Sequence, residues 1–145
     1  MSSKHGARSS KYIEEMLNVP VGEGCELRLE PIAVSMSDSA TTLVEKMIKD
    51  NIGAVVVVEK GRPVGIITEK DLLEKVIKPL KDMDLTLAGD TMSKPLITIE
   101  SDRPMKEALE LMRKHNIRRL VVTKEGALLG LVTERRFLEV AFLIT

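Results

Sequence analysis

The sequence predicts a mixed α/β (α+β) protein built from two tandem copies of one βαββα unit. The first observation is an internal repeat, because residues 32–74 align without a gap on residues 97–139. Identical pairs in this alignment include Asn51/Asn116, Gly65/Gly130 and Thr68/Thr133. The second observation is that short β-branched runs alternate with amphipathic segments in each copy, a pattern typical of strands and helices.

The first copy has the pattern of a strand, a helix, a hairpin and a second helix. Ser37-Asp38-Ser39 is a polar helix start, Asn51 is a helix end, and Gly61 separates two apolar runs. The helix has one apolar stripe, formed by Leu43, Val44, Met47 and Ile48. The expected elements are therefore strands at 32–35, 54–58 and 64–68, and helices at 40–51 and 69–77.

The second copy repeats this order. Its helix begins near Pro104 and carries the apolar stripe Met105, Ala108, Leu109 and Met112. Gly126 marks the hairpin turn, between strands expected at 120–123 and 128–133. A strand at 97–100 precedes these elements, and a helix from Glu134 to about Leu143 follows them.

Segments outside the repeat complete the expected organisation. Residues 78–95, with two prolines and a glycine, form a connector, and residues 12–17 form a short helix after a disordered tail at 1–10. We therefore divide the chain into an N-terminal tail with a short helix (1–26), a first domain (27–80), and a linker with a second domain (81–145).

Composition disfavours several classes of function. Lys plus Arg equals Asp plus Glu, at 22 each, so no net field attracts nucleic acid or an anionic membrane. Aromatic residues make up 2%, which leaves no platforms for stacking single-stranded nucleic acid. No apolar run approaches the length of a membrane span, and the single Cys25 forms no intrachain disulfide. We expect a cytoplasmic protein.

Each copy ends its hairpin with a similar motif. The first copy has Gly65-Ile66-Ile67-Thr68-Glu69-Lys70-Asp71, and the second has Gly130-Leu131-Val132-Thr133-Glu134-Arg135-Arg136. This repeated motif resembles the CBS domain family. The resemblance implies a stand-alone pair of CBS domains (a Bateman module), packed with pseudo-two-fold symmetry. It also implies a homodimer, head-to-head or head-to-tail, that binds AMP, ADP, ATP or S-adenosylmethionine between the copies and regulates an unidentified effector protein.

Thr68 and Asp71 are the principal ligand candidates. In the family pattern, the Thr hydroxyl and the Asp carboxylate bind the ligand, and the Asp accepts the ribose hydroxyls. The helix start that follows the strand also suits phosphate or ribose oxygens. The alternative is a capping box, in which the same two side chains stabilise the helix without any ligand. The same side chains can serve both roles.

The second copy departs from this pattern. Arg136 stands where the first copy has Asp71, and a guanidinium has no acceptor for ribose hydroxyls. We therefore expect one main site per chain, with an altered second site at Thr133 and Arg136. By the family resemblance, Arg118, Arg119 and Arg135 bind phosphate. The alternative is that these arginines form a solvated surface or dimer salt bridges.

The resemblance places the adenine in an apolar slot between the copies, although any of the lining residues can instead be plain core. These residues are Ile66, Leu96, Ile97, Ile117 and Val121. A ligand-free dimerising scaffold is the principal alternative function, and an S-adenosylmethionine site is another. The sequence shows no catalytic constellation, and His5 and His115 have no partners at metal-ligand spacing. We therefore expect no enzyme activity, no metal and no cofactor.

Overall fold

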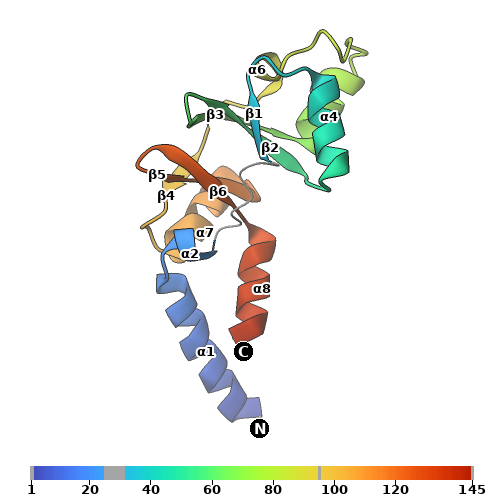
Figure 1. Ribbon diagram of the computed structural model, residues 1–145. Helices are drawn as coiled ribbons and strands as arrows, with labels where there is room; N and C mark the ends of the chain where they lie inside the picture. The colour runs from blue at the N-terminus through green and yellow to red at the C-terminus, as the bar shows by residue number, and fades with distance from the viewer. Residues whose placement is uncertain (1, 25–31, 95, 145) are drawn as a thin grey trace. The chain divides into compact units, whose positions relative to one another are not determined.

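The computed structural model describes residues 2–24, 32–94 and 96–144. Over these residues the chain forms two compact units, each with one three-stranded sheet and its helices (Figure 1). We call them the first-copy unit, built on β1–β3, and the second-copy unit, built on β4–β6. Two βαββα copies in an α+β fold are therefore confirmed.

The first-copy unit contains a mixed sheet in the order β1-β2-β3. Strand β1 (Ala33–Ser35) is parallel to β2 (Ala54–Glu59), and β2 is antiparallel to β3 (Arg62–Thr68). Helix α4 (Ala40–Lys49) makes the crossover between the two parallel strands. Helix α5 (Glu69–Leu72) follows β3 directly and continues as a π-helical turn, η1 (Leu73–Ile77).

The second-copy unit repeats this topology. Its strands are β4 (Thr98–Glu100), β5 (Arg119–Lys124) and β6 (Ala127–Thr133), in the order β4-β5-β6. Helix α7 (Met105–His115) connects the parallel pair β4 and β5. Helix α8 (Glu134–Ile144) follows β6. Every strand and helix expected from the repeat is therefore present, with its ends shifted by a few residues.

Residues in the left-handed region end the helices and close the hairpins. Asn51 and Asn116 have φ values of 51° and 52°, and they follow α4 and α7 as expected. Gly61 and Gly126 have φ values of 79° and 82°, and each follows a residue that also has positive φ. Two successive residues with positive φ fit the type I′ turn, whose twist matches that of a hairpin.

The core of the first-copy unit is aliphatic, as the composition predicts. Leu43 from α4, Val55 and Val57 from β2, and Ile67 from β3 are all fully buried. Alternate residues of a strand face the same side of the sheet, so Val55 and Val57 both face α4. Met92 from the connector joins the same cluster, which gives the connector a share of this core.

The connector packs on the first-copy unit through backbone hydrogen bonds. Ala40 N–H donates to Thr86 O at 2.8 Å, Ala88 N–H to Asp38 O at 2.8 Å, and Gly89 N–H to Met36 O at 2.9 Å. These bonds hold a short helix, α6 (Ala88–Thr91), against the loop that starts α4. The connector is therefore part of the first-copy unit and not a free linker.

The N-terminal segment makes the same set of bonds in the second-copy unit. Met105 N–H donates to Val19 O at 2.8 Å, Val21 N–H to Arg103 O at 2.7 Å, and Gly22 N–H to Ser101 O at 3.0 Å. They hold the short helix α2 (Val21–Gly24) against the loop that starts α7. In each unit, a segment from outside the βαββα copy thus closes the same loop.

Helix α1 (Ser2–Asn18) corrects one expectation. The sequence predicts a disordered tail at 1–10, but the helix begins at Ser2 and runs through the expected short helix at 12–17. It packs against α7 and α8 in the second-copy unit, and Met16 is buried. These packing partners lie far along the chain, so the local polarity of the tail does not reveal them.

The contact between Gly65 and Met92 leads to a testable prediction. A methyl group at Gly65 would lie 2.4 Å from Met92 Sδ and 2.8 Å from Met92 Cβ, so the connector would have to shift. We expect Gly65→Ala to lower the free energy of unfolding by about 1–3 kcal/mol. Urea denaturation should show a smaller cost when the same change is made in a Met92→Ala background. Equal costs in the two backgrounds would contradict the contact.

Candidate functional site

Thr68 and Asp71 form a closed turn where β3 passes into α5. Asp71 Oδ2 accepts from the Thr68 N–H at 2.9 Å and from the Thr68 hydroxyl at 3.0 Å. The Asp71 N–H donates in return to Thr68 Oγ1 at 3.3 Å. The capping box that the sequence offered as an alternative is therefore present. It fixes the orientation of the Asp71 carboxylate relative to the end of the strand.

The other carboxylate oxygen of Asp71 contacts two residues that sequence analysis did not select. Ser93 in the connector donates its hydroxyl to Asp71 Oδ1 at 2.9 Å. Lys75 Nζ lies 3.1 Å from the same oxygen. Both carboxylate oxygens are therefore engaged, and the Asp71 side chain is only 13% exposed.

Lys75 and Ser93 fasten the connector to this turn. Lys75 Nζ donates to Thr91 O at 3.1 Å and to Ser93 Oγ at 3.3 Å. The Ser93 N–H donates to Ile66 O on β3 at 3.0 Å. Lys75 stands four residues after Asp71 on a helix, which is a recognisable ion-pair spacing. Ser93 has no such signal, because it is 22 residues away from Asp71 in the chain.

The surroundings of Asp71 set its ionisation. Burial acts to raise the pKa of Asp71, because a charged carboxylate loses solvation there. Hydrogen bonds from the Thr68 backbone, Lys75, Ser93 and the Thr68 hydroxyl act in the opposite direction and outweigh burial. The pKa of Asp71 therefore lies below its ordinary value, and the group is ionised at neutral pH.

An ionised carboxylate at this position is an acceptor for hydroxyl groups. The Ser93 hydroxyl already donates to it, so the geometry around Asp71 Oδ1 admits an alcohol donor. A vicinal diol presents two such donors, and a carboxylate has lone pairs for both. The turn can thus accept a hydroxyl of a sugar diol if the Ser93 hydroxyl on Oδ1 gives way.

The equivalent turn of the second-copy unit has different chemistry. The Arg136 N–H donates to Thr133 Oγ1 at 3.2 Å, so the Thr cap is retained. The Arg136 guanidinium donates from Nε to Gly24 O at 3.3 Å, and its Nη1 lies 3.7 Å from Glu139 Oε2. Arg136 therefore holds the N-terminal segment, and a carboxylate acceptor is missing from this position.

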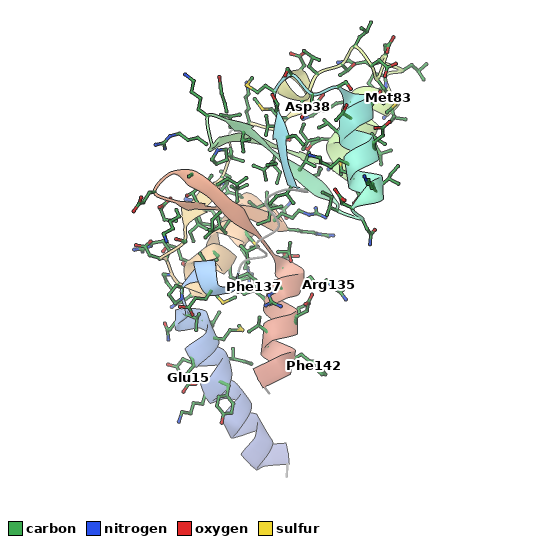
Figure 2. The ribbon with its side chains drawn as sticks, in the orientation of Figure 1. Glu15, Asp38, Met83, Arg135, Phe137 and Phe142 are labelled. Carbon is green, nitrogen blue, oxygen red and sulfur yellow. The ribbon has the colours of Figure 1, made fainter. Side chains whose placement is uncertain are left out.

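The three arginines assigned to phosphate all lie in the second-copy unit. Arg118 is exposed just before β5, and Arg119 is half-buried at the first position of that strand. Arg135 is 86% exposed on α8, where Nε lies 3.5 Å from Glu139 Oε1 (Figure 2). The Glu134 N–H donates to Arg118 O at 3.1 Å, which brings the backbone of Arg118 next to the start of α8. Their phosphate role stays a prediction.

The five apolar candidates for the adenine slot differ in burial. Ile66 on β3 is half-buried, and so are Leu96 and Ile97, which precede β4. Ile117 is half-buried after α7, whereas Val121 is 1% exposed within β5. The half-buried candidates retain surface for a ligand, and Val121 is a core residue of its sheet. The slot itself stays a prediction.

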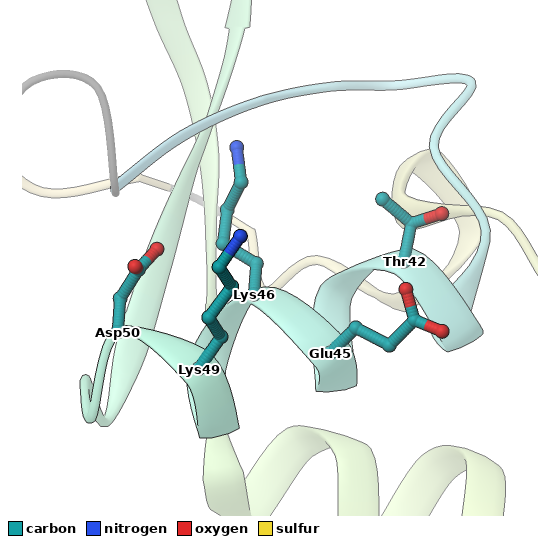
Figure 3. A pocket seen from close by; sticks show the side chains of 5 residues that line it. All are labelled: Thr42, Glu45, Lys46, Lys49 and Asp50. Carbon is teal, nitrogen blue, oxygen red and sulfur yellow. The ribbon is translucent and has the colours of Figure 1, made fainter.

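A hollow of about 250 Å³ lies beside α4 (Figure 3). It is lined by Thr42, Glu45, Lys46, Lys49 and Asp50. Lys46 Nζ donates to Ala33 O at 3.2 Å, so this lysine is already engaged with β1. The lining mixes both signs of charge and includes none of the residues that the sequence assigns to the ligand, so the hollow carries no functional assignment.

Comparisons with known proteins agree with the fold and the repeat. The CBS domain family model matches residues 26–78 and 88–142. An uncharacterized protein of Methanopyrus kandleri is 43% identical over 127 residues, which cover 86% of this chain and 64% of that protein. The CBS domain of a bacterial CNNM/CorC family Mg2+ transporter, solved in complex with ATP, has a TM-score of 0.81 at 20% identity. That match covers 95% of this chain and 97% of the transporter domain.

A hexameric CBS-CP12 protein from bloom-forming cyanobacteria shares the fold, with a TM-score of 0.74 at 20% identity. The match covers 84% of this chain and 67% of that one. The chain belongs to the CBS domain family and carries two CBS domains in tandem. It spans 64% of the Methanopyrus kandleri protein and 27% of a relative from Methanocaldococcus jannaschii. Among the described residues, no helix has the length and apolar character needed to cross a membrane.

The lowered pKa of Asp71 predicts how stability depends on pH. A folded-state pKa below the unfolded value stabilises the folded chain above the unfolded pKa, and this contribution is lost as the pH falls through the folded pKa. We expect Asp71→Asn to lower the free energy of unfolding by about 1 kcal/mol near neutral pH. The difference from the wild type should shrink as the pH is lowered into the acid range.

Urea denaturation across a pH series measures this difference directly. Asp102→Asn, in an exposed turn of the second-copy unit, is the matched control and should change stability little at any pH. A destabilisation by Asp71→Asn that stays constant down to strongly acid pH would contradict an ionised, hydrogen-bonded Asp71.

Proposed function

We propose that the chain is a non-catalytic regulatory module that binds an adenosine nucleotide at one main site. Asp71 of the first CBS domain accepts a ribose hydroxyl, and Thr68 positions its carboxylate. The observation that carries this proposal is the ionised, oriented Asp71 carboxylate, which already accepts an alcohol donor in the free chain. In the second domain Arg136 stands at the same position, which supports one main site and not two.

The family supports an adenosine ligand, and a CBS domain of the same fold has been solved in complex with ATP. Resemblance to the family assigns the phosphates to Arg118, Arg119 and Arg135, and the adenine to the apolar residues around Ile66. Three guanidinium groups favour AMP, ADP or ATP over the cationic S-adenosylmethionine. S-adenosylmethionine remains the alternative ligand, and a ligand-free scaffold is the alternative function.

Isothermal titration with AMP, ADP, ATP and S-adenosylmethionine tests the proposal. We expect the wild type to bind at least one of these with micromolar affinity. Asp71→Ala should weaken that binding at least tenfold, or about 1.4 kcal/mol. Because Asp71 also closes a capping box, circular dichroism must show that the variant is folded at the titration temperature.

Thr133→Ala is the matched control for this titration. It removes the equivalent capping oxygen in the second domain and leaves the Asp71 turn intact, so it should change the affinity little. Failure of all four ligands to bind, after any co-purified nucleotide has been removed, would favour the scaffold. Tight binding that Asp71→Ala leaves unchanged would place the site elsewhere.

We also propose that the chain assembles as a homodimer through its CBS domains. The second helical segment of each copy exposes two apolar side chains at equivalent positions. Leu73 and Ile77 are 59% and 43% exposed, and Leu138 and Phe142 are 71% and 81% exposed. The same exposed stripe in both copies supports burial against another chain, because large side chains gain free energy when they leave water.

Light scattering coupled to size-exclusion chromatography tests the stripe. A charge at its centre would be buried without a partner in the dimer, so Leu73→Asp and Leu138→Asp should each shift the chain toward monomer. Leu85→Asp is the matched control, because Leu85 is 78% exposed in the connector and lies outside the stripe. If the stripe variants keep the mass of the wild type, the dimer uses another surface.

A further inference from the structure

Asp71 and Arg136 occupy equivalent positions in the two CBS domains, and each holds a segment from outside its own βαββα copy. In the first-copy unit, Asp71 holds the connector, because its Oδ1 accepts the Ser93 hydroxyl at 2.9 Å. In the second-copy unit, Arg136 holds the N-terminal segment, because its Nε donates to Gly24 O at 3.3 Å. Each side chain thus fastens a segment from outside its βαββα copy onto the start of the second helix.

We propose that the Ser93 hydroxyl is an internal competitor for the ligand, and that nucleotide binding releases the connector from Asp71. This inference rests on the proposed function, since it concerns the acceptor that the ribose uses. In the free chain Ser93 satisfies Asp71 Oδ1. In the bound chain a ribose hydroxyl replaces it.

Ser93 is the donor that leaves most readily, because the other partners of Asp71 belong to the same capped turn and helical segment. Oδ2 is held by the N–H and hydroxyl of Thr68, which lie in the same capped turn. Lys75 stands one turn further along the same helical segment and remains within reach of Oδ1. Ser93 belongs to the connector, and its side chain can rotate away from Asp71 at the cost of two hydrogen bonds, the one it donates to Asp71 Oδ1 and the one it accepts from Lys75 Nζ.

Release at Ser93 affects the segment that leads into the second domain. Ser93 precedes β4, which begins at Thr98, and its N–H is bonded to Ile66 O on β3. Loss of the Asp71 bond therefore removes one of the contacts that hold the connector to the first-copy unit ahead of β4, and the backbone bond to Ile66 O is left. The Arg136 guanidinium has no acceptor for a hydroxyl donor, so a ribose hydroxyl cannot displace its bond to Gly24 in the same way.

Competition between the Ser93 hydroxyl and the ligand determines whether removal of that hydroxyl raises or lowers the affinity for nucleotide. A ligand that must break the Ser93 bond binds more weakly than it would without that bond, because part of its interaction free energy opposes the competitor. Removal of the Ser93 hydroxyl should therefore tighten binding. A residue that merely positioned Asp71 for the ligand would have the opposite effect when removed.

The test combines titration with hydrogen exchange on the full chain, with AMP, ADP and ATP as probes. We expect Ser93→Ala to bind at least one nucleotide about threefold or more tightly than the wild type. Nucleotide should also speed amide exchange over residues 86–93 of the wild type, and free Ser93→Ala should already exchange faster there. Thr86→Val is the matched control, because its hydroxyl donates to Asp82 O within the connector and its removal should leave the affinity unchanged.

The outcomes separate this inference from the proposed function. Weaker nucleotide binding by Ser93→Ala, or slower amide exchange of the connector in the presence of nucleotide, overturns the inference that Ser93 competes with the ligand. Either result leaves the proposed nucleotide site in place. Equal affinity of Ser93→Ala and the wild type also overturns the competitor. If neither protein binds any of the three nucleotides, the proposed function fails and the competitor fails with it.

Discussion

The carboxylate of Asp71 joins the turn and helix at residues 68–75 to the connector at Ser93, which is 22 residues away in the chain, and the local structure of the first CBS domain depends on this junction. One oxygen caps the start of α5 through Thr68, and the other holds the connector through Ser93 while Lys75 braces both. Four donors around one carboxylate keep it ionised despite its burial. A buried, ionised acceptor is costly unless every lone pair is used, so any ligand at this position must replace a donor and not simply add one.

The two domains share one arrangement, which they build with side chains of opposite charge. In both, a segment from outside the βαββα copy closes the loop before the first helix by three equivalent backbone hydrogen bonds. A side chain at the start of the second helix then fastens that segment, with Asp71 in one domain and Arg136 in the other. The acid is compatible with hydroxyl ligands and the guanidinium is not. This difference makes the first domain the natural place for a regulated contact.

The repeat predicted the strands, the helices and the glycine turns because these depend on side-chain periodicity, which a single sequence displays. The closing segments were missed, since their backbone hydrogen bonds require no particular side chains at Thr86 or Val19. Helix α1 was assigned to a disordered tail because its stability depends on packing against α7 and α8. Thr68 and Asp71 were found from their motif, and Lys75 could have been found from its helical spacing. Ser93 carries no local signal, because only the fold brings it to Asp71.

In the proposed mechanism, Asp71 Oδ1 binds either the Ser93 hydroxyl or a ligand hydroxyl. The most direct measurement is a crystal structure of the chain with its tightest-binding nucleotide. We predict a ribose hydroxyl within hydrogen-bonding distance of Asp71 Oδ1 and the Ser93 hydroxyl turned away from it. A bound nucleotide that leaves the Ser93–Asp71 hydrogen bond intact, with no ribose contact at Asp71, would contradict the account.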